Sequence, residues 1–125
     1  MKKVLATTKA PAAIGPYSQA IRADKFVFVS GQLPIDPHKG TIPDSIHEQT
    51  CLCLERIRDL VEKAGFKMQD VVKTTVYLTD FSKFSQMNEA YMTYFSEPYP
   101  ARCACEVSAL AQGASVEIDC VAVQE

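Results

Sequence analysis

The chain is poor in the residues on which several common chemistries depend. Among its 125 residues are two histidines, His38 in a proline-rich turn and His47 near the start of an expected helix. No histidine pair is therefore placed to act as acid and base or to hold a metal ion. The sequence also contains neither a P-loop nor a G-x-G-x-x-G motif, which leaves a nucleotide cofactor without support.

Charge, hydropathy and cysteine content narrow the choice of partner and compartment. A net charge of -2 gives no broad basic surface of the kind that attracts nucleic acid or an acidic membrane. The apolar run near the N-terminus is short and broken, so it predicts neither a signal peptide nor a membrane span. Five cysteines, an odd number, favour free thiols in a reducing compartment, and we expect a cytoplasmic protein without a metal site or a disulfide framework.

The pattern of apolar residues predicts one α+β domain over residues 1–125. Ser45 and Glu48 form an S-x-x-E capping box at the start of a helix that Gly65 ends. Pro98 and Pro100 stop a second helix. The expected order is a hairpin over residues 17–30, a helix over 45–64, a strand over 71–79, a helix from 80 to the prolines, and strands over 102–107 and 115–123.

This order places two crossover helices on the same side of a mixed sheet and leaves the other face of the sheet uncovered. Strand alternation puts five large apolar residues on the open face, and these are Phe26, Phe28, Tyr77, Val121 and Val123. Such a patch is large to leave in water, so we expect association through the sheet. The alternative is that these residues are scattered surface apolars, which are common in any protein.

Charged residues are expected on the same open face. If Cys103 and Cys105 face the helices, the period of two places Arg102 on the open face, and Glu117 and Asp119 point the same way from the last strand. A charge in an intersubunit face is costly unless it is paired. Two interpretations of these charged residues remain open. They form a structural ion pair that fixes the interface, or they form a site that binds a charged ligand.

Three further positions carry polar groups or open backbone where apolar side chains would be ordinary. Asn88 lies on the apolar stripe of the second helix and must be hydrogen-bonded inside, either to a backbone turn or in a functional contact. Ser30 and Gly31 end a strand with a hydroxyl and a backbone without a side chain, where another group can approach closely. A plain Ser-Gly turn would give the same pattern.

Six segments together identify a family resemblance. They are GPYSQA at 15–20, FVSGQLPIDP at 28–37, VVKTTVYLTD at 71–80, MNEAYMTYF at 87–95, YPAR at 99–102 and VEIDCVAV at 116–123. In this order they resemble the reactive intermediate deaminase family, called Rid or YjgF and also endoribonuclease L-PSP. The resemblance implies a chorismate-mutase-like α+β fold, a mixed sheet with two helices packed on one face, and a homotrimer whose sheet faces meet and whose ligand clefts lie between subunits.

The activity that this resemblance implies is the hydrolysis of short 2-imino acids, or their enamine tautomers, to 2-keto acids and ammonia. 2-Iminobutanoate and 2-iminopropanoate are the expected substrates, and no cofactor is required because an imine carbon is already electrophilic. Arg102 matches the arginine that grips the substrate carboxylate, and Glu117 matches the acidic residue that orients or deprotonates water. The other matched positions line the cleft, namely the hydroxyls of Tyr17 and Ser30, the backbone of Gly31, and Asn88 as a brace.

One departure and two rival functions accompany the resemblance. Many family members carry a cysteine where this chain has Ala104, so a role for that thiol is excluded. The family resemblance also allows an endoribonuclease that inhibits translation, but the acidic balance and the lack of a histidine pair support that function poorly. The third function is a metabolite-binding or chaperone-like protein. We expect small-molecule imino or keto acids as partners, with neither nucleic acid nor membrane.

Overall fold

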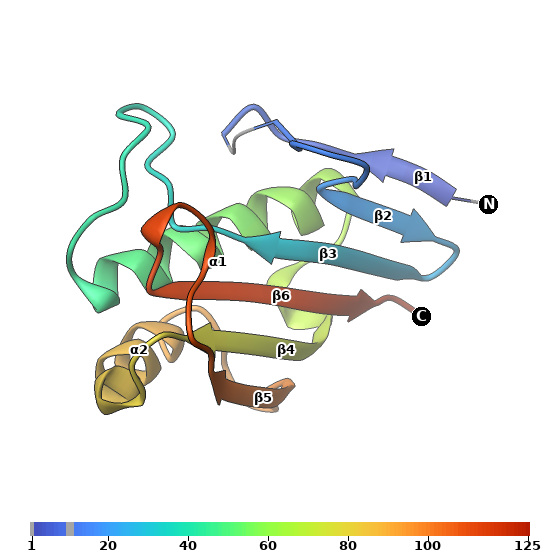
Figure 1. Ribbon diagram of the computed structural model, residues 1–125. Helices are drawn as coiled ribbons and strands as arrows, with labels where there is room; N and C mark the ends of the chain where they lie inside the picture. Colours follow the sequence, from blue (N-terminus) through green and yellow to red (C-terminus); the bar gives the residue numbers. More distant parts are fainter. Residues whose placement is uncertain (1, 10–11) are drawn as a thin grey trace.

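The computed structural model describes residues 2–9 and 12–125, and its centre is one six-stranded sheet (Figure 1). The strands follow the order β1-β2-β3-β6-β4-β5, in which β4 and β5 are parallel and all other neighbours are antiparallel. The elements are β1 (Lys2–Leu5), β2 (Ala20–Ala23), β3 (Phe26–Gln32), α1 (Ile46–Lys63), β4 (Val71–Leu78), α2 (Phe84–Tyr91), β5 (Ala101–Glu106) and β6 (Val116–Val123).

α1 forms where its caps and its apolar stripe predict it. The hydroxyl of Ser45 accepts a hydrogen bond from the Glu48 backbone N–H at 3.2 Å, which satisfies one of the free donors of the first turn. Gly65 follows the helix with φ of 82°, a left-handed conformation that suits glycine. The stripe that includes Cys53, Ile57 and Leu60 is fully buried against the sheet.

α2 is shorter than the sequence predicts. It begins at Phe84 after a 3-10 turn and ends at Tyr91, well before Pro98. Beyond it the hydroxyl of Thr93 donates to the backbone carbonyl of Ala90 at 2.7 Å, a local bond that competes with helix continuation. Phe95 remains buried although it lies outside the helix, which is why the stripe alone overestimated the length.

Strand β1 was not predicted. It pairs antiparallel with β2 at one edge of the sheet, with Lys3 opposite Arg22. The four residues of β1, two of them lysines, show little alternation of apolar and polar side chains. Lysine on an edge strand also protects the sheet against pairing with a further strand. The hairpin of β2 and β3 was predicted and is present, with Asp24 at φ of 55° in its turn.

The two helices and the core lie on one side of the sheet, as expected, and α1 crosses behind β3 and β6 in Figure 1. No described segment forms a second layer on the other side. There Phe26 and Phe28 are 42% and 47% exposed and stack with ring centroids 5.9 Å apart. Val123 and Val121 are their register partners on β6. The predicted apolar open face is therefore confirmed at these strands.

The prediction of which alternate side chains of β5 face the helices was wrong. Ala104 packs against the core, and the Arg102 side chain reaches the helix α2, while Cys103 is exposed on the open face. The reason is the parallel pairing with β4, which sets Arg102 beside Thr74. Thr74 faces the helices, so its neighbour does too.

β6 behaves as predicted. Val116, Ile118, Cys120 and Ala122 are buried on the helix side, so Glu117 and Asp119 alternate onto the open face. Arg102 and Glu117 of one chain consequently lie on opposite faces of its sheet. The expectation that Arg102 and Glu117 share one face of the sheet is therefore wrong.

Candidate functional site

Arg102 is held by three side chains of α2. Its Nη1 donates to the amide oxygen Oδ1 of Asn88 at 2.7 Å. Its guanidinium carbon lies 4.8 Å from the ring centroid of Tyr91 and 5.4 Å from that of Phe84, both within cation–π distance. Phe84, Asn88 and Tyr91 stand at i, i+4 and i+7, so they form one stripe of the helix. The stripe predicted as core is also the support of the arginine.

A surface cavity of about 420 Å³ opens beside this arginine. Its walls are Asn88, Tyr91, Met92, Tyr99, Pro100 and Arg102. A guanidinium has five N–H donors, and the contact with Asn88 accounts for one of them. Arg102 stays exposed, so further donors can reach a carboxylate in the cavity. The cavity can thus hold a small anion with an apolar part against its aromatic wall.

The hydrogen-bond partner of the Asn88 side chain, which the sequence left open, is Arg102. The ordinary explanation, a local bond to a backbone turn, does not apply, because Asn88 Oδ1 accepts from Arg102. Asn88 is also only partly buried. Its amide therefore fixes the arginine and lines the cavity at the same time.

A second group of predicted residues surrounds Glu117 on β6. Gly31 in β3 lies directly against this side chain, and a Cβ added there would collide with the Glu117 carboxylate. The register between β3 and β6 shifts between Val29 and Gln32, which displaces the backbone at this point. Glycine is therefore the residue that lets the carboxylate lie along the strand.

Burial and charge raise the pKa of Glu117. Partial desolvation of the carboxylate is the larger cause, and the negative charge of Asp119 on the same face is the second. Asp119 in turn accepts a hydrogen bond from the Tyr77 hydroxyl at 3.2 Å, and burial together with the Asp119 charge raises the pKa of Tyr77. A carboxylate with a raised pKa is suited to take up and return a proton.

Ser30 and Tyr17 lie near the Gly31 end of β3. The Ser30 hydroxyl donates to the backbone carbonyl of Ser18 at 2.6 Å, so its hydrogen is engaged and its oxygen remains an acceptor. Tyr17 is exposed and shares a hollow of about 60 Å³ with Gly31. The predicted residues thus fall into two groups, the Arg102 group on the helix side and the Glu117 group on the open side.

Sequence reasoning missed how Arg102 is supported. Phe84 and Tyr91 were assigned to the core only, and Thr74 was assigned to no site. The available signal was the amide of Asn88 within an apolar helix stripe, because a polar side chain there needs a partner. The arginine that follows the second helix was the candidate for that partner.

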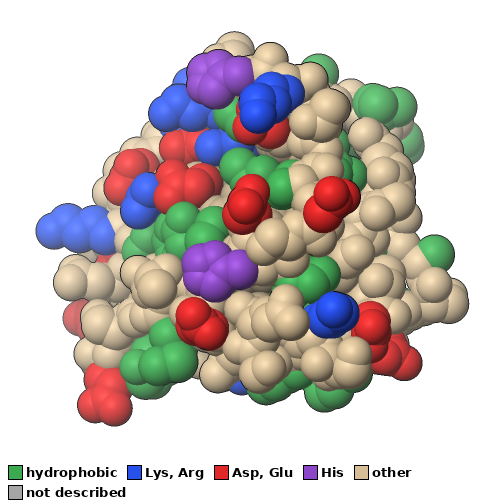
Figure 2. Space-filling model, turned by 90° about the vertical axis from the view of Figure 1, so that its left-hand side faces the viewer, with side chains coloured by type: hydrophobic (Ala, Val, Ile, Leu, Met, Phe, Trp, Pro, Cys, Tyr) green, Lys and Arg blue, Asp and Glu red, His purple; other side chains and the backbone are tan. Residues whose placement is uncertain are grey.

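Figure 2 shows Lys and Arg side chains interspersed with Asp and Glu on one face, without a basic patch. Within residues 2–9 and 12–125, no three His, Cys, Asp or Glu side chains gather in a way that could hold a metal ion. Over the same described residues, no helix combines the length and the apolar character needed to cross a membrane.

Comparisons with known proteins agree with this architecture. The sequence model described as Endoribonuclease L-PSP matches residues 7–124. A RutC family protein of Pyrococcus horikoshii is 49% identical over all of both chains. The 2-iminobutanoate/2-iminopropanoate deaminase of the mouse is 46% identical over 99% of this chain and 91% of its own. The crystal structure of E. coli TdcF with bound serine superposes with a TM-score of 0.93, at 38% identity, and covers 98% of this chain and 99% of that one.

The mixed sheet with two helices on one face is the α+β fold of the E. coli YjgF gene product, whose crystal structure superposes with a TM-score of 0.93, so this part of the fold prediction is confirmed and the homotrimer stays a prediction. The chain belongs to the Endoribonuclease L-PSP family, also called Rid or YjgF.

Proposed function

We propose that the protein hydrolyses short reactive 2-imino acids or their enamines, such as 2-iminobutanoate and 2-iminopropanoate, to 2-keto acids and ammonia. The observation that carries the proposal is the Arg102 group, a guanidinium with free donors beside a small cavity with an aromatic wall. A planar fork of this kind suits a carboxylate. Relatives named 2-iminobutanoate/2-iminopropanoate deaminase, 41–46% identical, support the same substrate class.

We further propose a homotrimer with clefts between subunits. In one subunit the Arg102 group and Glu117 lie on opposite faces of the sheet, so a single subunit cannot present both to one small ligand. Two neighbouring copies can, if the open face of one meets the edge of β5 in the next. The exposed, stacked Phe26 and Phe28 give such a contact apolar surface to bury.

The chemistry then follows from the two groups. Arg102 holds the carboxylate, and Glu117 of the adjoining subunit takes a proton from water as the oxygen attacks the imine carbon. The product is a tetrahedral amino alcohol. Glu117 returns that proton to nitrogen and then takes the remaining hydroxyl proton as the C–N bond breaks. Ammonia leaves, the C=O of the keto acid forms, and the proton on Glu117 passes to solvent. A positioned acid or base contributes about 10²- to 10⁴-fold to such steps.

The substrate itself explains why this reaction needs no cofactor, since a protonated imine is already activated toward water. Tyr17, Ser30 and Gly31 would line the Glu117 side of the cleft. We place the activity in the cytoplasm, where the five cysteines, all free in the structure, would remain reduced.

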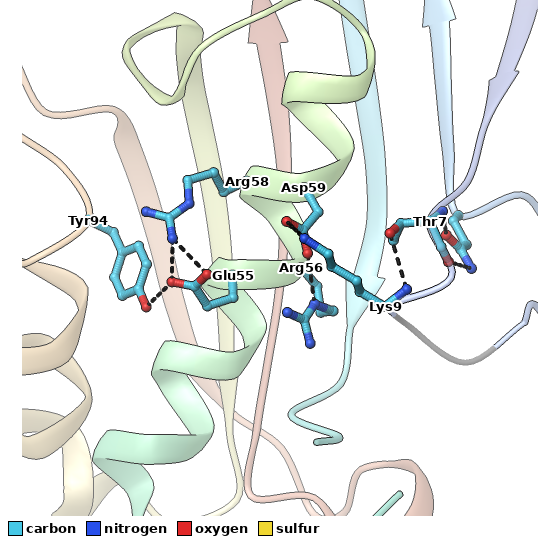
Figure 3. Close-up of polar contacts among 8 residues, drawn as sticks. Thr7, Lys9, Glu55, Arg56, Arg58, Asp59 and Tyr94 are labelled. Atoms are coloured by element: carbon cyan, nitrogen blue, oxygen red, sulfur yellow. Dashed lines mark hydrogen bonds and ion pairs between the residues drawn. The ribbon is translucent and has the colours of Figure 1, made fainter. Parts of the chain in front are cut away.

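The first test is a coupled assay in which a threonine dehydratase generates 2-iminobutanoate and semicarbazide traps it. The wild type should suppress trapping, and Arg102→Ala should not, while it remains folded and keeps its oligomeric state. Arg58→Ala is the matched control, because Arg58 also lies over a tyrosine ring, 5.4 Å from the centroid of Tyr94, and pairs with Glu55 (Figure 3). None of these three residues lines the cavity. Trapping that the wild type leaves unchanged would refute the deaminase proposal.

The shared site has a test of its own in subunit complementation. Arg102→Ala and Glu117→Ala should each keep only a residual activity alone, about 1% or less of the wild-type value, because each removes one side of every cleft. In mixed assemblies formed at equal amounts, about one cleft in four combines an intact Arg102 with an intact Glu117 from its neighbour. Activity should therefore recover to about a quarter of the wild-type value, whereas a site within one subunit would recover none.

A further inference from the structure

Arg102 occupies a position where an arginine has little inherent order. It lies in β5, an edge strand whose outer side has no neighbour in the sheet. Its side chain is exposed, and a free arginine side chain loses rotamer entropy when it is fixed. A ligand that had to order this side chain would bind more weakly by that loss. Within one subunit, the orientation must therefore come from elements on the inner side.

α2 restricts the guanidinium in two ways. The rings of Tyr91 and Phe84 set the plane in which the flat group lies. The amide oxygen of Asn88 fixes rotation within that plane through the 2.7 Å bond to Nη1. Of the two rings Tyr91 is the nearer, at 4.8 Å, and it is almost completely buried.

The ring of Tyr91 is itself held in place by the hydroxyl of Thr74. Tyr91 Oη and Thr74 Oγ1 form a hydrogen bond of 2.8 Å, and the two residues are 4% and 0% exposed. Thr74 lies in β4 and is the register partner of Arg102 in β5. A buried tyrosine hydroxyl without a partner is costly, so removal of either hydroxyl favours a shift of the ring or entry of water.

We propose that the Thr74–Tyr91 hydroxyl pair positions Arg102 for carboxylate binding, an inference that rests on the proposed function for the role of Arg102. Thr74 and Tyr91 act as positioning residues. Thr74 holds the phenol, the phenol ring holds the plane of the guanidinium, and the free donors of the guanidinium then point into the cavity before any ligand arrives. The positive charge of Arg102 lies close enough to act on the Tyr91 hydroxyl, although burial still raises the pKa of Tyr91.

The test uses variants that remove one hydroxyl and keep the shape, namely Tyr91→Phe, Thr74→Val and the double variant. The matched control is Tyr94→Phe, which removes a hydroxyl that donates to Glu55 at 2.6 Å (Figure 3), and neither of these residues lines the cavity. Titration calorimetry measures binding of 2-oxobutanoate and of its neutral amide. We expect the Kd of the carboxylate to rise about three- to tenfold in each single variant, the Kd of the amide to stay the same, and the control to match the wild type.

A second readout needs no ligand. The order parameter of the Arg102 Nε–H bond, measured by ¹⁵N relaxation and assigned with Arg102→Lys, should fall in both single variants and not in the control. The double variant should be no worse than either single variant, because both act through one bond.

The outcomes separate this inference from the proposed function. Wild-type affinity and order in Tyr91→Phe or Thr74→Val overturn the positioning role while the deaminase proposal stands. Equal weakening of acid and amide binding also overturns it, because that result indicates general disturbance of the cavity. Wild-type binding of 2-oxobutanoate by Arg102→Ala overturns both proposals. If Kd and the Arg102 order parameter change as expected but the wild-type protein does not hydrolyse 2-iminobutanoate, the positioning role is supported and the proposed function is refuted.

Discussion

Replacing Gly31 with alanine should disable Glu117 and leave the fold intact. An added Cβ would lie 2.8 Å from Cδ and 3.2 Å from Cγ of Glu117, and closer still to Oε2. Non-bonded carbon atoms are most stable at about 3.5–4.0 Å, so the carboxyl group must rotate away. The displaced atoms belong to the end of a side chain, and the backbone of Gly31 is not in the left-handed region, so the strand can accept alanine.

The magnitude follows from these two facts. If Glu117 supplies the proton transfer, its displacement should lower kcat by about 100-fold or more. The free energy of unfolding should change little, since alanine at a compatible position stabilises by about 0.4–1 kcal/mol through the unfolded chain. Thermal unfolding should therefore give a Tm within a few degrees of the wild type.

The assay is the rate of 2-iminobutanoate hydrolysis, with Gly31→Ala also introduced into a Glu117→Ala background. That background has no carboxylate for the methyl group to displace, so Gly31→Ala should cause no further loss there. A folded Gly31→Ala variant with wild-type kcat would refute the argument. An equal loss in both backgrounds would also refute it, because the glycine would then act through its own backbone on the ligand.

Three further predictions concern charge and capping. Asp119→Asn removes a negative charge that raises the pKa of Glu117, so the acidic limb of the kcat/KM profile should shift to lower pH, and an unchanged limb would contradict the assignment. The pKa of Glu117 is raised in the folded protein, so its protonated form contributes favourably to stability below the ordinary glutamate pKa of about 4.3. This contribution is lost as the pH rises through the folded pKa. Glu117→Gln, which stays neutral, should therefore raise Tm at neutral pH. Ser45→Ala removes the cap of α1 and should lower the free energy of unfolding by about 1 kcal/mol in urea titrations, whereas no change would mean that water replaces the cap.

The order of the helices and strands from β2 onward was predictable because most of them have their own period and their own stop signals. α1 carries a cap, an apolar stripe and a terminal glycine, and three independent signals agree on it. β6 alternates buried and half-buried residues without interruption from Val116 to Val123. β1 gave no such signal, since an edge strand of four residues with two lysines buries only Leu5.

The phase of β5 could not be read from its own residues. Alternation makes Ala101, Cys103 and Cys105 its apolar face and places Arg102 and Glu106 on the other, which is the reverse of the phase in the structure. Pairing with β4 decides the phase, and that information lies in another strand. The candidate site was predicted residue by residue from family resemblance, but its division between two faces depends on this phase and became visible only in three dimensions.

The support of Arg102 also links the site to the stability of a short helix. α2 has eight residues, fewer than the roughly 12–15 that an isolated helix needs in water, so it depends on packing of Met87 and Tyr91 in the core. Local opening of α2 would release Asn88 and Tyr91 from Arg102 together, without unfolding the sheet. Carboxylate affinity should therefore decline before global unfolding as temperature rises, because the grip of Arg102 depends on α2, the shorter of the two helices.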